Sequence, residues 1–191
     1  VEECQSLGLA LKTLGRRKDV YVAAETMGPV RKLKEVPKDR WREVILEGVE
    51  ERLKILQTDC IDVFNAHELA DGYSRDRFEF VIDVLKEIRE QGKIGSIGVA
   101  DHHPRFVAEL IRKYDCFDSV MIPYNYHLQE ARDSLFPLCK ALNIGVVVMK
   151  PFCWPYYGIP FNYFCPADLK TGDFTPNQIS ALGVLSALFA A

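Results

Sequence analysis

The sequence predicts an α/β fold, an incomplete (β/α)8 barrel, and two observations carry this prediction. Short runs of β-branched residues alternate with stretches whose apolar residues recur at helical spacing, which is typical of parallel strands joined by crossover helices. No G-x-G-x-x-G phosphate turn follows the first strand, where residues 25–29 read ETMGP. The lack of that turn favours a barrel over the alternative, an open doubly wound sheet.

Five strands and six helices are expected along the chain. The strands are predicted over residues 20–24, 60–65, 94–99, 119–122 and 144–149. The helices are predicted over residues 2–14, 38–56, about 81–88, 107–114 and 135–142, with a last helix from Thr175. Two turn residues agree with these bounds, since Gly92 suits a left-handed helix end and Pro104 suits a first helical position.

The length indicates that the barrel is incomplete. A whole (β/α)8 barrel takes about 250 residues, whereas this chain has 191 and carries no initiator Met. We therefore expect one partial barrel domain over residues 1–191, the middle portion of a longer polypeptide. Because five strands alone leave two open parallel edges, an oligomer that covers those edges is a candidate partner.

The composition excludes several classes of protein. A formal net charge of -3 and a pI near 5.9 argue against a nucleic-acid-binding protein. No apolar run reaches the roughly 18 residues of a membrane span, and the amino-terminal segment reads as neither a signal nor a transit peptide. The six cysteines show no two-residue spacing, so we expect a reducing compartment, the cytoplasm.

Four segments carry a family resemblance. They read QTDCIDVFNAH at residues 57–67, QGKIGSIGV at 91–99, MIPYNY at 121–126 and IGVVVMKPF at 144–152. In this order they are similar to the T-D-Y-I-D-L…H, GKIRxIGVS, Q-x-x-YN and seventh-strand segments of the aldo-keto reductase superfamily. The chain therefore resembles this superfamily over most of residues 6–152, and the resemblance implies a (β/α)8 TIM barrel of aldo-keto reductase type.

The resemblance implies reduction of a small carbonyl compound by hydride transfer from NAD(P)H. In the family a Tyr donates the proton, a Lys paired with an Asp lowers the Tyr pKa, and a His orients the carbonyl group. His67 matches that His, whereas the Asp and Tyr belong to units upstream of residue 1. The Lys position is taken by Glu25, and a carboxylate there would raise the pKa of a neighbouring Tyr. This chain alone is thus expected to be inactive.

The resemblance also implies where a nicotinamide cofactor, NADP(H) or NAD(H), would bind, although the residues differ from the family pattern. Asp101 can still accept a hydrogen bond from the carboxamide, and Met side chains can pack against the nicotinamide ring. The implied cofactor-binding residues are Ala100, Asp101, Met121, Met149, Lys150, Pro151 and Phe152.

Several of these residues also have a purely structural interpretation. His67 could be a hydrogen-bonded residue at a strand end. His102 and His103 could suggest a metal site, but adjacent loop residues rarely chelate one ion, so we interpret them as loop and N-cap residues and expect no metal. Asp59 and Asp62 lie near the start of a strand, at the stable end of the barrel, and are predicted to be structural.

Three functions are compatible with this pattern. The first is an oxidoreductase of aldo-keto reductase type, in which His67 polarises the carbonyl oxygen and Glu25 has an unassigned role. The second is a catalytically retired relative that serves as a regulatory or scaffold subunit, which the replaced Lys, Gln and Ser-Asn positions favour. The third is a truncated product without activity.

Overall fold

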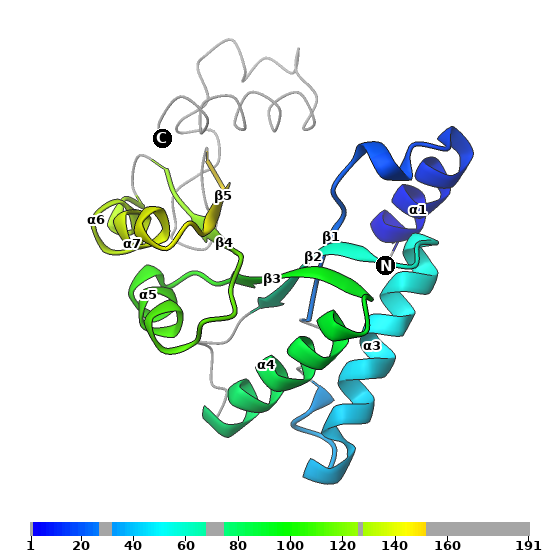
Figure 1. The fold of residues 1–191 in the computed structure, drawn as a ribbon, viewed down its shortest axis with the longest axis horizontal. Helices are drawn as coiled ribbons and strands as arrows, with labels where there is room; N and C mark the ends of the chain where they lie inside the picture. The colour runs from blue at the N-terminus through cyan, green and yellow to red at the C-terminus, as the bar shows by residue number, and fades with distance from the viewer. Residues whose placement is uncertain (1, 27–31, 68–74, 126–127, 152–191) are drawn as a thin grey trace.

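A computed structural model describes residues 2–26, 32–67, 75–125 and 128–151. Within these ranges five strands form one parallel sheet in the order β1-β2-β3-β4-β5 (Figure 1). The strands are β1 (Ala23–Glu25), β2 (Ile61–His67), β3 (Ile94–Ala100), β4 (Ser119–Pro123) and β5 (Gly145–Met149). Each strand pairs with the next one in the sequence, without the reversal of strand order that defines a doubly wound sheet. The described part of the chain is therefore consistent with an incomplete (β/α)8 barrel, as predicted.

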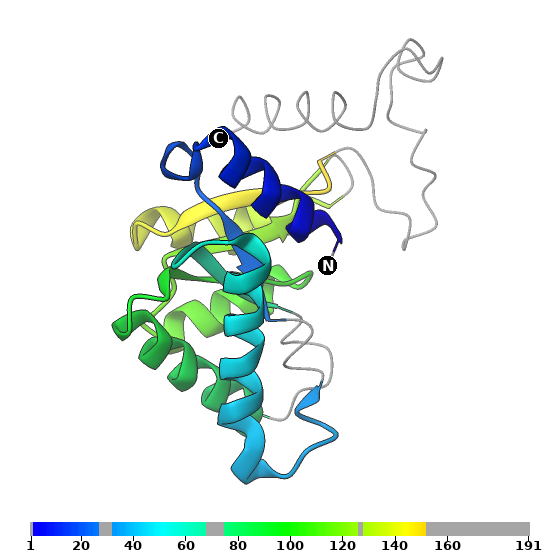
Figure 2. The ribbon, with the colours of Figure 1, turned by 90° about the vertical axis from the view of Figure 1, so that its right-hand side faces the viewer.

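Helices alternate with these strands and form an arc around the sheet (Figure 1). The α-helices are α1 (Glu2–Leu14), α3 (Trp41–Leu56), α4 (Arg75–Glu90), α5 (Pro104–Lys113), α6 (Glu130–Ser134) and α7 (Phe136–Ala141), and the 3-10 helices are η1 (Arg17–Asp19) and η2 (Lys38–Arg40). Figure 2 shows α1 beside α3, where Gly8 approaches the backbone of Leu56 so closely that a Cβ atom would lie 2.9 Å from its Cα. Among the described residues, no helix is long and apolar enough to cross a membrane.

The hydrophobic core lies between the sheet and the helices. Side chains of alternate residues on each strand point to this outer face, because successive residues of a strand face opposite sides. The outer-face side chains of β2, β3 and β4 are buried. The side chains of α3, α4 and α5 that point toward the sheet are buried as well. The core includes Phe64, Ala66, Ile97, Val99, Val120 and Ile122 from the strands and Ile45, Val49, Val81, Leu85, Ile88, Val107 and Ile111 from the helices.

The inner face of the sheet carries smaller and more polar residues. One register row pairs Glu25 with Asn65, Asn65 with Gly98, Gly98 with Ser119, and Ser119 with Gly145. Gly98 is required in this row, since a Cβ atom there would lie 2.0 Å from Oδ1 of Asn65. The glycine therefore leaves room for a buried polar side chain from the neighbouring strand.

Two predicted elements differ notably from the structure, and a third is not tested by it. The first strand begins at Ala23 rather than at residue 20. The reason is that the carbonyl of Val20 accepts a hydrogen bond from the Arg17 side chain and that Tyr21 is 90% exposed. The helix predicted over 135–142 corresponds to α7, and the short helix α6, which was not predicted, precedes it and is separated from it by Leu135. A Pro in the first turn of α7 explains the break. The helix predicted from Thr175 lies outside the described residues.

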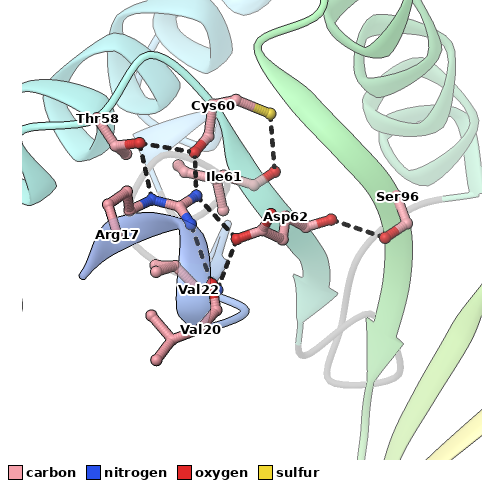
Figure 3. Close-up of polar contacts among 8 residues, drawn as sticks. All are labelled: Arg17, Val20, Val22, Thr58, Cys60, Ile61, Asp62 and Ser96. Carbon is pink, nitrogen blue, oxygen red and sulfur yellow. Dashed lines mark hydrogen bonds and ion pairs between the residues drawn. The ribbon is translucent and has the colours of Figure 1, made fainter.

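A polar network joins the amino ends of β1 and β2 (Figure 3). The Arg17 guanidinium donates to Oγ1 of Thr58 (2.9 Å) and to the carbonyls of Cys60 (2.6 Å) and Val20 (3.1 Å), and its Nη2 lies 2.8 Å from Oδ2 of Asp62. The same Oδ2 accepts from the backbone N–H of Val22 at 2.7 Å. Asp62 thus ties β1 to β2 at the end opposite to the strand carboxyl ends, which agrees with a structural role.

Candidate active site

The carboxyl ends of the parallel strands bring together side chains from distant parts of the chain. Glu25 ends β1, His67 ends β2, His102 follows β3 and Lys150 follows β5. In a (β/α)8 barrel this edge of the sheet is the one that holds the reacting groups. We therefore take this cluster, with the residues that support it, as the candidate active site.

His67 is fixed at the end of β2 by the segment that follows β1. Its side chain and backbone are 9% exposed, and its backbone N–H donates to Oγ1 of Thr26 at 3.1 Å. The backbone N–H of Thr26 in turn donates to the carbonyl of Asn65 at 3.0 Å. These two bonds continue the pairing of β1 with β2 by one residue, so the position of His67 depends on the buried Thr26.

Glu25 lies against the ring of His67. Its Oε2 atom is 3.0 Å from Nδ1 of His67, while the Glu25 side chain is 43% exposed and that of His67 is 11% exposed. Among the described residues no atom meets hydrogen-bond geometry with this Nδ1. The pair is therefore a close polar contact rather than an aligned hydrogen bond.

His102 approaches the same place from the loop after β3. Its ring centroid lies 6.3 Å from that of His67, with 60° between the ring planes. On its other side, Nζ of Lys150 lies 2.7 Å from Nε2 of His102. Burial, and then the positive charge of Lys150, lower the pKa of His102 below its ordinary value of 6.5. An ammonium group can only donate, so Nε2 of a neutral His102 accepts and the ring proton is on Nδ1.

Lys150 is held by the loop after β4. Its backbone is left-handed, with φ of 58°, and its carbonyl accepts from Nδ2 of Asn125 at 3.0 Å. Oδ1 of Asn125 accepts from the N–H of Leu128, also at 3.0 Å. The side-chain amide of Asn125 thus joins the loops after β4 and β5 and supports the unusual backbone of Lys150.

Asp101 shapes the loop that carries His102. It is only 2% exposed, and its Oδ1 accepts from the backbone N–H of His103 at 3.0 Å and lies 2.9 Å from Nδ1 of that residue. Its own backbone N–H donates to the carbonyl of Met121 at 3.3 Å. The carboxylate therefore fixes the turn between β3 and α5, in which His102 is the middle residue.

Three of the sequence-predicted site residues share one row of the sheet. The register pairs His67 with Ala100, Ala100 with Met121, and Met121 with Val147, and residues paired in a parallel sheet point to the same face. Met149 pairs with Pro123 one row further toward the carboxyl ends. Both Met side chains are half-buried, so the inner face beside His67 offers soft apolar surface.

The structure brings most of the sequence-predicted residues to this edge, including Glu25, Asp101 and Lys150. Pro151 follows Lys150 and is half-buried, whereas Phe152 lies outside the described residues. Three supporting residues were given no role in the site from the sequence: His102, which was interpreted as a loop residue, Thr26 and Asn125. A signal existed for each, since every one of them directly follows, or lies within two residues of, the end of a strand. Within the described ranges, no group of three His, Cys, Asp or Glu side chains could hold a metal ion.

Comparison with known proteins shows which family the chain resembles in sequence. The chain is similar to the aldo-keto reductase YhdN of Bacillus subtilis, with 29% identity over 147 residues, which cover 77% of this chain and 43% of that protein. It is also similar to the aldo-keto reductase yakc [NADP(+)] of Schizosaccharomyces pombe, with 25% identity over 91% of this chain and 50% of that protein. The chain thus spans about half the length of these relatives.

Solved structures agree with the sequence comparison. An aldo-keto reductase from Bacillus halodurans, solved in apo and holo forms, matches with 28% identity and TM-scores of 0.58 and 0.59. The match covers 76% of this chain and 44% or 45% of that one. The model of the aldo/keto reductase family matches residues 2–153. The chain therefore belongs to the aldo/keto reductase family.

Proposed function

We propose that this chain is part of an NAD(P)H-dependent oxidoreductase that reduces a small carbonyl compound. The observation that carries the proposal is the position of His67, on the inner face at the carboxyl end of β2 and in one register row with Ala100 and Met121. This places an imidazole beside the residues that the family resemblance assigns to the nicotinamide. The activity is a proposal for the whole protein, since the chain spans about half of its relatives.

The side chains at the strand ends fit a nicotinamide group. Asp101 supplies a buried carboxylate, which can accept from a carboxamide NH₂. Met121 and Met149 supply polarisable thioethers that pack against planar rings. When bound, the reduced nicotinamide supplies the hydride for the carbonyl carbon. The name of the Schizosaccharomyces pombe relative includes NADP(+), which supports the phosphorylated form of the cofactor.

Each of the other residues at the strand ends has a separate role in the proposed reaction. His67 contacts the carbonyl oxygen, and Glu25 and Thr26 hold its ring and backbone. Burial, and then the positive charge of Lys150, lower the pKa of His102, so the second imidazole adds a dipole rather than a full charge beside the first. Because Glu25 occupies the position of the family's Lys, the polar groups around His67 differ from the family pattern. The relatives named above are described as reductases, which gives no support to the regulatory or scaffold alternative.

A titration of the purified chain with NADPH and with NADH, followed by nicotinamide emission, tests the proposal. We expect saturable binding that is weakened several-fold when Met121→Ala and Met149→Ala are combined, because both substitutions remove ring contacts. Arg16→Ala is the matched control, since Arg16 is an exposed residue of the segment before η1 that pairs with Asp19. A folded chain that binds neither cofactor, or a double variant that binds as tightly as the control, would contradict the proposed site.

A further inference from the structure

The first turn of α4 carries an arginine without a counter-ion among the described residues. Arg77 is half-buried, and its Nε atom is fully buried with no hydrogen-bond acceptor in the described structure. Its charged group instead lies over the ring of Trp41, with Cζ 5.6 Å from the ring centroid. Because taking a charged group out of water without a partner is costly, we expect an anion to complete the surroundings of Arg77.

A second cation lies over the same indole ring. Lys38 belongs to η2, and its Nζ atom is 5.7 Å from the centroid of the Trp41 ring. Lys38 is exposed, and it forms no ion pair within the described part of the chain. One aromatic side chain therefore brings together two positive charges from segments that are far apart in the sequence.

Trp41 is fixed well enough to position both cations. It is 6% exposed, and its Nε1 atom donates to the carbonyl of Val36 at 3.2 Å. Its ring meets the ring of Phe80 edge to face, with 5.6 Å between the centroids. Since Phe80 lies one turn after Arg77 on α4, the contact that holds the indole also holds the start of α4 close to η2.

Neighbouring cations on the same elements have carboxylate partners. Arg42 donates to Oε2 of Glu87 at 3.0 Å and 2.7 Å, and Nε of Arg40 lies 2.5 Å from Oε2 of Glu43. Asp39 lines a shallow hollow along α3 together with Arg42 and Glu43. The carboxylates of this region are thus engaged with other cations, and the two charges over the indole are left for a group from outside the chain.

We propose that Arg77 and Lys38 form a binding site for a phosphate-type oxyanion, either free phosphate or the phosphate group of a small ester. A guanidinium presents parallel N–H donors to such a group, and an ammonium adds a compact positive charge. The site lies in the helix layer, away from the row of His67, Ala100 and Met121 on the inner face of the sheet. It is therefore separate from the proposed cofactor contacts and does not rest on the proposed function.

The fluorescence of Trp41 reports binding directly. A Trp154→Phe background leaves Trp41 as the only Trp of the chain, and it is titrated with inorganic phosphate and, separately, with glycerol 3-phosphate, with NaCl keeping the ionic strength constant. We expect a saturable change with at least one of the two, and the tighter binder tells free phosphate from an ester. Arg77→Gln and Lys38→Gln should each weaken binding about ten-fold or more, because each removes charge-assisted hydrogen bonds.

A matched variant and a second measurement control this experiment. Arg105→Gln removes one positive charge from an exposed residue of α5 that pairs with Glu130, and it should leave the affinity unchanged. Because a ligand that binds the folded state stabilises it, the preferred anion should raise the Tm of the wild type and of Arg105→Gln but not that of Arg77→Gln. A folded wild type without a saturable response to either anion, or an Arg77→Gln variant that binds as tightly as Arg105→Gln, would overturn the inference. Neither measurement uses a nicotinamide cofactor, so this failure is distinct from a failure of the proposed function.

Discussion

Nζ of Lys150 lies 2.7 Å from Nε2 of His102, although the two residues follow different strands and are separated by β4 in the sheet. The contact exists because the loop after β3 turns around Asp101 and because Asn125 supports the left-handed backbone of Lys150. Its chemical effect is that the ammonium group adds to the effect of burial and lowers the pKa of a second imidazole near His67. The carboxyl edge thus has a carboxylate at β1, two imidazoles in the middle and a cation at β5.

Removing the charge of Lys150 should raise the pKa of His102. Burial is the larger cause of the lowered pKa, and the Lys150 charge is the second, so Lys150→Met should recover part of the shift. NMR titration of the His102 ring protons measures it. Lys140→Met, which removes an exposed charge on α7, is the control and should leave the pKa of His102 unchanged. An equal pKa in the two variants would contradict the contact.

The same contact makes stability depend on pH. His102 has a lower pKa in the folded protein than in the unfolded chain, so the unfolded state binds more protons between the two values. The contribution to the free energy of unfolding is therefore present above the ordinary value of 6.5, and it is lost as the pH falls through the folded pKa. Lys150→Met should lose less stability than the wild type on acidification from pH 7, as measured by urea unfolding at several pH values. A steeper loss in the variant would contradict this.

The sequence was sufficient to predict the five strands and most of the helices between them, because the periodicity of buried residues follows directly from the sheet and helix geometry. Ile97 and Val99 alternate with inner-face residues, and the stripe of Val81, Leu85 and Ile88 marks α4. The start of β1 could not be predicted in this way. Its β-branched residues suggest a strand from residue 20, but pairing with Asp62 and Arg17 decides where the ladder begins.

The candidate site was predicted only in part, for a related reason. Residues such as His67 and Asp101 end or follow strands, and their gathering at one edge follows from parallel pairing. The partners of His102 could not be inferred, because its contact with Lys150 requires a left-handed backbone 48 residues away. Adjacent His102 and His103 look alike in the sequence, yet one contacts Lys150 and the other contacts Asp101.

Replacing Thr26 by Val should remove the hydrogen bond that holds the backbone of His67. The substitution keeps the shape of a buried side chain but removes the acceptor for the His67 N–H, and a buried amide without a partner costs about 1–3 kcal/mol. We expect faster hydrogen exchange at the His67 amide and a lower free energy of unfolding. Thr26→Ser keeps the hydroxyl group and should preserve the protection of that amide. Unchanged exchange in Thr26→Val would show that the bond does not hold the strand end.

Replacing Gly98 by Ala should destabilise the inner face. The new Cβ would lie 2.0 Å from Oδ1 of Asn65 and 2.8 Å from Oγ of Ser119, and overpacking of this kind costs about 1–3 kcal/mol. Gly145→Ala is the matched control in the same register row, since its Cβ would meet only ordinary contacts at 3.6 Å and 3.7 Å. Urea unfolding compares the two variants.

A double variant identifies the cause of the Gly98 effect. If the clash with Asn65 is responsible, Gly98→Ala should cost less in an Asn65→Ala background, and the two changes should be non-additive. Full additivity, or an equal effect of Gly145→Ala, would contradict the close approach of Asn65 to Gly98.

Replacing Arg17 by Ala should destabilise the protein far more than replacing its neighbour Arg16. The Arg17 guanidinium joins η1 to the start of β2 through Thr58, Cys60 and Asp62 (Figure 3), and hydrogen bonds of charged groups are worth about 1.5–3 kcal/mol. Arg16 pairs with Asp19 at the surface, and such pairs contribute about 0–1 kcal/mol. Arg17→Lys should be intermediate, because an ammonium keeps the charge but loses the planar fork that reaches several acceptors at once. Chemical unfolding of the three variants gives the order, and equal losses for Arg17→Ala and Arg16→Ala would show that the network does not couple β1 to β2.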